Sequence, residues 1–184
     1  MNKIIISVFA QDRPGIVAAV SKALLKHECN IENISQTILQ HQFAGIFITS
    51  VPSDVQIDQL HDYLKQCMQP LNIDVHVKSM DYQEPLPISK SSEPFVISAV
   101  GADSKGLVAG LTEIFARYRV NVTNLKAVFK GGDDPSHNIM IYEVDIPDDI
   151  DQNNFVRDLR KRAENLGLDI SIQHRKIFEM MNKI

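Results

Sequence analysis

The pattern of apolar and polar positions changes period within the first 25 residues of the chain. Residues 4–9 form a short, mostly β-branched apolar run, which predicts a buried strand. From residue 16 onward the apolar positions recur at helical spacing, which predicts an amphipathic helix. They are Ile16, Val17, Val20, Ala23 and Leu24. The four residues between the two patterns, 12–15, are therefore expected to form a strand-to-helix turn.

The residue types in this turn favour the start of a helix and the approach of an anion. Pro14 has no N–H to lose and a φ suited to a first helical turn, and the Asp12 carboxylate can accept hydrogen bonds from free N–H groups there. Gly15 has no Cβ at a place where a ligand could approach the backbone. Free N–H groups at a helix start favour anions, so the sequence predicts an anion site near residues 15–17.

The same pattern occurs twice. Residues 5–17 align without gaps on residues 96–108, an offset of 91 residues that takes Asp12 to Asp103. Further along, the offset becomes 95 residues, which takes Pro52 to Pro147. The change falls on residues 131–135, a Gly-Gly-Asp-Asp-Pro cluster that predicts an enlarged hairpin loop in the second copy.

Each copy is predicted to have the order strand, helix, strand, strand, helix, strand. In the first copy these elements are expected at about residues 2–10, 14–28, 31–41, 43–51, 55–68 and 72–79. The βαββαβ order favours an α+β, ferredoxin-like fold, an antiparallel sheet with both helices on one face. We expect domains at 1–80 and 94–184, joined by a proline-containing linker at 81–93.

Composition narrows the class of protein. The chain is 44% hydrophobic and 23% charged, which is ordinary for a soluble globular protein, and its net charge of −4 argues against a nucleic-acid-binding surface. The basic run at 157–162 is expected to be a solvated helix face. The apolar runs are too short to span a bilayer and the N-terminus resembles no signal segment, so a cytoplasmic protein without a membrane role is expected.

Residue types that carry catalysis or bind metal do not occur in recognisable patterns. Cys29 and Cys67 have neither metal-ligand spacing nor a disulfide framework, and the six histidines are scattered. The sequence has no Gly-x-Ser-x-Gly motif and no phosphate loop, and residues 101–106 lack the middle glycine of a dinucleotide turn. We therefore expect a protein that is not an enzyme and uses no metal or cofactor.

The Asp-x-Pro-Gly-Ile-Val sequence at 12–17, followed by Asn30-Ile31, resembles the ACT domain, a ligand-sensing βαββαβ module of amino-acid metabolism. The second copy keeps Asp103 and Gly106 but has Ser104-Lys105 where the first has Arg13-Pro14. A pair of such domains without a catalytic domain is similar to the glycine cleavage system transcriptional repressor group. The first copy also resembles the ACT domain of formyltetrahydrofolate deformylases.

The resemblance implies an amino-acid site between paired units whose sheets lie side by side. A free amino acid is a zwitterion, so backbone N–H groups would bind its carboxylate, and aspartate or asparagine oxygens its ammonium. The candidate residues of the first copy are Asp12, Arg13, Gly15, Ile16, Val17, Asn30 and Asn33. Those of the second are Asp103, Gly106, Leu107, Val108, Asn121 and Asn124.

Each candidate also has a purely structural interpretation. The aspartates could only cap a helix, the glycines could only allow close packing of helix on strand, and the asparagines could only satisfy nearby backbone groups. Arg13 and Lys105 could attract an anion or be merely solvated.

The function expected from these features is amino-acid-sensing regulation without catalysis. The ligand expected is a small amino acid such as glycine or serine, and the output is control of transcription in glycine and one-carbon metabolism. A protein partner such as a DNA-binding regulator would bind the DNA, because this chain is not expected to contact nucleic acid itself. We also expect a homo-oligomer. The alternatives are a detached regulatory subunit of an amino-acid biosynthetic enzyme, an enzyme, and a structural protein that assembles through its sheet edges.

Overall fold

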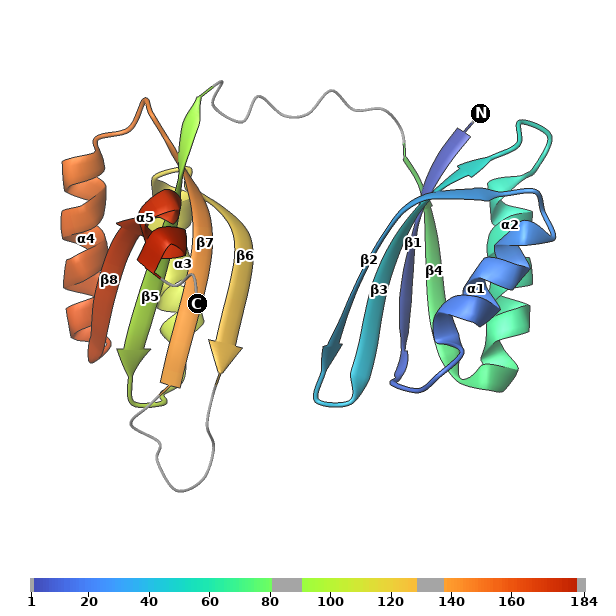
Figure 1. Cartoon of the computed structure of the whole chain (residues 1–184), viewed down its shortest axis with the longest axis horizontal. Coiled ribbons are helices and arrows are strands. Elements are labelled where there is room, and N and C mark those ends of the chain that lie inside the picture. The colour runs from blue at the N-terminus through green and yellow to red at the C-terminus, as the bar shows by residue number, and fades with distance from the viewer. Residues whose placement is uncertain (1, 81–90, 129–137, 182–184) are drawn as a thin grey trace. The chain divides into compact units, whose positions relative to one another are not determined.

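A computed structural model describes residues 2–80, 91–128 and 138–181 of the chain. The chain divides into two compact units, residues 1–86 and 87–184 (Figure 1). The enlarged hairpin loop expected at 131–135 lies outside the described residues. None of the helices in the described ranges is long and apolar enough to cross a membrane.

The first unit has the predicted βαββαβ order. Its elements are β1 (Asn2–Gln11), α1 (Ile16–Leu25), β2 (Asn30–Leu39), β3 (Gln42–Val51), α2 (Ile57–Met68), the 3-10 turn η1 (Gln69–Leu71) and β4 (Ile73–Ser79). The strands form one antiparallel sheet in the order β2-β3-β1-β4, and both helices cover the same face (Figure 1). The α+β, ferredoxin-like prediction is confirmed.

The second unit repeats this order and adds a helix. Its elements are β5 (Ser92–Gly101), α3 (Leu107–Arg117), β6 (Asn121–Val128), β7 (Asn138–Pro147), α4 (Gln152–Asn165), β8 (Leu168–His174) and α5 (Arg175–Met181). The sheet order is β6-β7-β5-β8. The strand β5 begins at Ser92, two residues before the expected domain start at 94, because Ser92 already pairs with Pro147 in the sheet. The sequence pattern did not predict α5.

The core follows the alternation and helical spacing of the sequence. In β1, Ile4, Ile6 and Val8 are fully buried against the helices, while the residues between them point to the other face. In α2, Leu60 and Leu64 are also fully buried. Each such side chain contributes about 1.5–3 kcal/mol by leaving water, so each unit has its own hydrophobic core.

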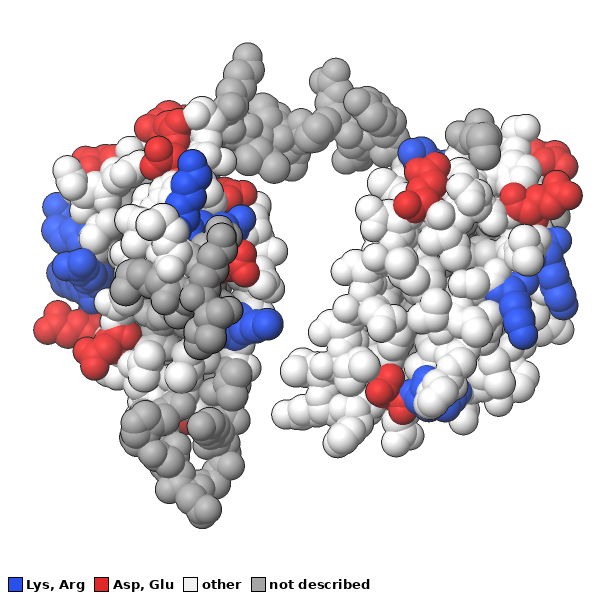
Figure 2. All heavy atoms as spheres, viewed as in Figure 1, with Lys and Arg blue, Asp and Glu red and all other residues white. Residues whose placement is uncertain are grey.

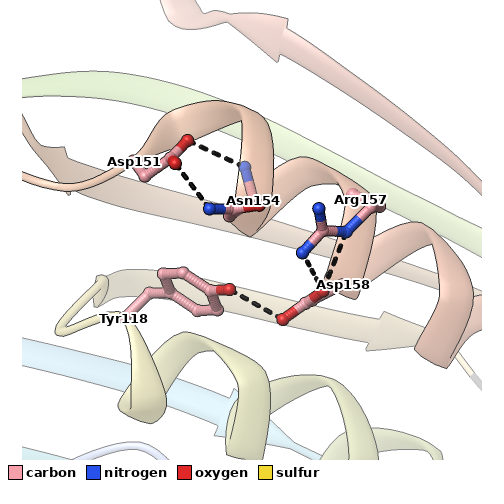
Figure 3. Close-up of polar contacts among 5 residues, drawn as sticks. All are labelled: Tyr118, Asp151, Asn154, Arg157 and Asp158. Carbon is pink, nitrogen blue, oxygen red and sulfur yellow. Dashed lines mark hydrogen bonds and ion pairs between the residues drawn. The ribbon is translucent and has the colours of Figure 1, made fainter.

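Polar contacts fix the first half of α4 in the second unit (Figure 3). The Asp151 carboxylate caps the helix by accepting a hydrogen bond of 3.0 Å from the backbone N–H of Asn154. Tyr118 directly follows α3, and its hydroxyl donates a hydrogen bond of 2.7 Å to the Asp158 carboxylate in α4. This hydrogen bond lowers the pKa of Asp158 and raises the pKa of Tyr118, because it stabilises the carboxylate and the protonated phenol together.

The N-caps of α4 and α2 can be compared within one chain. Gln56 is the N-cap residue of α2, as Asp151 is of α4, but its side chain forms no capping hydrogen bond. We predict that Asp151→Ala lowers the free energy of unfolding of the second unit by about 1 kcal/mol, since an N-cap bond is lost. The control Gln56→Ala is expected to change stability far less. Urea unfolding, with hydrogen exchange of the α4 amides to resolve the unit, measures both. Equal effects of the two substitutions would contradict the role of Asp151.

The Tyr118–Asp158 bond predicts a pH dependence. The folded pKa of Asp158 is lowered, so its contribution is present above about pH 4 and is lost as the pH falls through the folded pKa. The folded pKa of Tyr118 is raised, so its contribution is present below about pH 10 and is lost as the pH rises through the folded pKa. Tyr118→Phe should therefore destabilise the second unit at neutral pH, and the difference from wild type should shrink at acid pH. A difference that is constant from pH 3 to 8 would contradict this.

Candidate functional site

In each unit, the first helix begins directly after a glycine in the left-handed conformation. Gly15 has a φ of 99° and Gly106 a φ of 90°, and each is the N-cap of its helix. A side chain is strained at such a φ, which is why glycine stands there. The close-packing interpretation is wrong, because a Cβ placed on either glycine would have no atom within 4 Å. The space in front of both glycines is open.

The expected capping by the aspartates is also wrong. Neither α1 nor α3 has a side-chain cap hydrogen bond, and α1 begins at Ile16, not at Pro14 as the pattern suggested. The first intrahelical bonds run from Ala19 N–H to the Gly15 carbonyl at 2.9 Å and from Gly110 N–H to the Gly106 carbonyl at 2.8 Å. The N–H groups of the first turn therefore have no helical partner and point toward the open space.

The first turn is tied to two neighbouring segments. The Asp12 N–H donates a hydrogen bond of 2.8 Å to the carbonyl of His41, in the β2–β3 hairpin. The Arg13 guanidinium donates to the Leu71 carbonyl in η1, so this cation is engaged by the backbone. These bonds hold the backbone of the turn while the Asp12 side chain stays exposed.

The second turn lies over an open depression. Residues 103–109 line it, and its volume is about 710 Å³. Asp103 and Lys105 are both exposed and both line it, together with the first residues of α3. A carboxylate and a cation beside free N–H groups match the two charges of an amino acid. Leu107 is buried, as is Ile16 in the first unit, so each of these residues can contribute only its backbone.

The asparagines lie at the other end of each sheet. On β3, Asn33 pairs with Ile48 and Asn30 pairs with Ser50. The first turn follows Gln11, which pairs with Gln42 at the opposite end of β3. At about 3.3 Å per residue, roughly 20–26 Å separates the asparagines from the turn of their own unit. The pairing of β6 with β7 separates Asn121 and Asn124 from Gly106 in the same way. One unit therefore does not bring the two groups of predicted residues together.

A β-bulge precedes the second asparagine in both units. The register shifts between Ile31 and Asn33 in the first unit and between Val122 and Asn124 in the second. Asn124 is engaged within its unit, because its side-chain amide donates to the Glu143 carboxylate at 2.8 Å. The side chains of Asn30, Asn33 and Asn121 are exposed.

Asn138 is a polar residue near the second turn that sequence reasoning missed. It pairs with Gly101 at the end of β5, is only 1% exposed, and neither side-chain amide atom has a hydrogen-bond partner among the described residues. The repeat contained a signal for it, since the offset of 95 residues aligns Asn138 with Phe43, a core residue. A buried amide at a position built for an apolar ring is costly unless it has a partner.

Metal and nucleophile chemistry have no geometric support within residues 2–80, 91–128 and 138–181. No group of three or more histidine, cysteine, aspartate or glutamate side chains there could hold a metal ion. Cys29 is buried, and burial raises the pKa of its thiol, which makes it a poor nucleophile.

Comparisons with known proteins agree with this geometry. A family model described as "ACT domain" matches twice, at residues 2–78 and 93–173. A UPF0237 protein of Methanopyrus kandleri is 38% identical over 82 residues, and one of Methanocaldococcus jannaschii is 37% identical over 83 residues. Each match covers 91% of the relative and 44% of this chain.

Solved structures share the fold over nearly the whole chain. One of them, that of a "putative glycine cleavage system transcriptional repressor", covers 94% of this chain and 96% of its own at a TM-score of 0.68 and 17% identity. At that identity the likeness shows the fold alone. The two family matches together span most of the sequence, and the chain therefore belongs to the ACT-domain family, with two copies of the domain in tandem.

Proposed function

We propose that the protein is a non-catalytic sensor of a small amino acid, with glycine and serine as the first candidates. The observation that carries this proposal is the repeated helix start, in which a left-handed glycine leaves N–H groups open beside an exposed aspartate. The N–H groups bind the ligand carboxylate, and Asp12 or Asp103 binds its ammonium group. Lys105 adds a second partner for the carboxylate in the second unit.

The location of the asparagines supports a site shared by two protomers. Two copies of β2, one from each protomer and related by a two-fold axis, would pair antiparallel. In this pairing, the Leu39 end of β2 in one protomer lies beside the Asn30 end of β2 in the other. The strand-to-helix turn of each protomer lies at the Leu39 end of its own β2. The turn of one protomer then meets Asn30 and Asn33 of the partner subunit, which a single unit keeps apart.

The composition of β2 favours this pairing. Nine of its ten residues are exposed, and between Asn30 and Val51 the sequence has no lysine, arginine or aspartate and one glutamate, Glu32. Figure 2 shows the result as a largely uncharged surface over β2 and β3. The opposite edge strand, β4, carries Asp74 and Lys78 instead. Natural proteins block exposed edges with charge, so the less charged edge, β2, is the one suited to pairing.

The output we propose is transcriptional control of glycine and one-carbon metabolism through a DNA-binding protein partner. The shared fold with a protein described as a glycine cleavage repressor supports it, as does the acidic net charge of −4, which disfavours direct contact with DNA. Ligand binding must favour one arrangement of the protein over another for the signal to pass.

Amino-acid binding predicts a selective gain in thermal stability. At a hundredfold excess over Kd, glycine or serine should add about 2.7 kcal/mol to the free energy of unfolding. Asp12→Asn and Asp103→Asn, measured singly and together, should weaken binding at their own turn by roughly ten- to a hundredfold, since a charged hydrogen bond is lost. Asp54→Asn, an exposed aspartate outside both turns, is the control. No shift with any amino acid would contradict the proposal.

A mixing experiment tests whether protomers share the site. The experiment uses two proteins, one with Asp12→Asn and one with Asn33→Ala. Both also carry Asp103→Asn, which removes binding at the second turn. Each protein alone should bind the amino acid weakly. In a mixed dimer one site contains both changes and the other contains neither, so mixing should restore strong binding to about half of the sites in the mixed dimers. Binding that mixing does not restore would place the whole site within one protomer.

The partner class is tested by capture from a cell extract with and without the ligand found above. We expect a DNA-binding regulator whose retention depends on the amino acid. Ligand-dependent retention of a biosynthetic enzyme would instead identify the protein as a detached regulatory subunit.

A further inference from the structure

The sheet of the first unit has an apolar face that its helices leave uncovered. Alternate residues of β1 and β3 point away from α1 and α2, and their side chains form a contiguous patch on the two central strands. We call this patch the open face, and it consists of Ile5, Phe9, Ala44, Ile46 and Ile48. Phe9 is 53% exposed and Ile46 is 48% exposed. Contiguous exposed apolar side chains of this size mark a contact surface.

Charged residues flank the open face on the edge strand β4. Asp74 pairs with Phe9 in the sheet, and Lys78 pairs with Ile5. Both are exposed, and neither forms an ion pair within the part of the chain that the structure describes. They lie two residues on either side of His76, so a negative and a positive charge are placed symmetrically about one rung of the sheet.

The second unit shows what happens to this face when it is covered. Val96 occupies the position of Ile5, yet it is only 3% exposed, whereas Ile5 is half-buried. The helix α5 contacts β5 and β8, and its first residue, Arg175, forms an ion pair of 3.1 Å with Glu143, which lies on this face at the position of Ile48. The described part of the first unit has no counterpart of α5. A helix on the sheet prevents a second sheet from stacking there, so the open face of the first unit is the one that can accept a sheet.

We propose that the open face packs against the same face of a second copy of this chain, as two sheets stacked about 10 Å apart. The two-fold axis lies along the rung of Ser7, Ile46 and His76. Phe9 then packs on Ile5 of the partner subunit, and Ile46 meets Ile46 of the partner subunit at the axis.

Charge fixes this arrangement and selects the second copy as the occupant. A two-fold axis through the His76 rung places Asp74 opposite Lys78 of the partner subunit, and Lys78 opposite Asp74 of the partner subunit. An apolar centre with complementary charge at its rim is the usual anatomy of a specific interface. The residues of the open face lie on β1 and β3, so this contact does not use the pairing of the β2 edges.

A charge exchange tests the proposal in the full-length protein. Analytical ultracentrifugation measures the association of wild type, Asp74→Lys, and the double variant Asp74→Lys/Lys78→Asp. The single variant places lysine opposite lysine twice in each assembly, and we expect the dissociation constant of this contact to rise by roughly tenfold or more. The double variant restores opposite charges, and association should return.

Ile46→Glu tests the apolar centre and should abolish the contact, because it buries two unpaired carboxylates together. Ile139→Glu, a change at a similarly exposed isoleucine on the equivalent face of the second unit, should leave it unchanged. Circular dichroism confirms that each variant is folded.

Three results would overturn the proposal. The first is association of equal strength in wild type and Asp74→Lys. The second is a double variant that is folded but does not associate, and the third is a wild-type chain that does not self-associate. If the open face is shielded from solvent in a monomer, something other than a second copy covers it.

Discussion

Each unit turns from its first strand into its first helix through a glycine whose φ of 99° or 90° is strained for any other residue. The helix begins immediately after this glycine, so the N–H groups of its first turn are neither capped by a side chain nor covered by a Cβ. The aspartate three residues earlier is thereby left free to act on something other than the helix. The proposed binding chemistry depends on this one backbone conformation, which both copies share.

In the proposed site, the sheet topology would connect ligand binding to assembly. Order β2-β3-β1-β4 places the turn at one end of the sheet and the bulge with its asparagine at the other. A two-fold pairing of edge strands is the simple way to bring the two ends together. The β2 edge carries fewer charged residues than the β4 edge, which favours β2 as the strand that pairs. The proposed stacking of the open face would add a second contact with two-fold symmetry between copies of the chain.

Much of this fold was predictable from the sequence because repetition and periodicity report burial directly. The two offsets of 91 and 95 residues align almost every strand and helix, and the apolar positions of α2 and α4 are the buried ones. Capping was predicted wrongly because Asp12 and Pro14 are good residues for a helix start, while the backbone of Gly15 decides where the helix begins. Long-range pairing caused the other error, since the asparagines follow the turn closely in sequence but lie at the far end of the sheet.

The features that the sequence did not predict depend on tertiary contacts. The helix α5 is short, and its ion pair with Glu143 joins residues of α5 and β7 that no local pattern connects. Asn138 stands out only when the copies are compared, because a lone asparagine at a strand start is unremarkable by itself.

The central claim is that the glycine-capped helix starts bind an amino-acid carboxylate, and backbone ¹⁵N–¹H NMR during an amino-acid titration tests it most directly. A carboxylate bound there should shift the amide signals of residues 15–17 or 106–108 first and most, in a saturable manner, with the signals of α2 and α4 little changed. Saturable shifts confined to other residues, or none at either turn with any amino acid, would contradict the account.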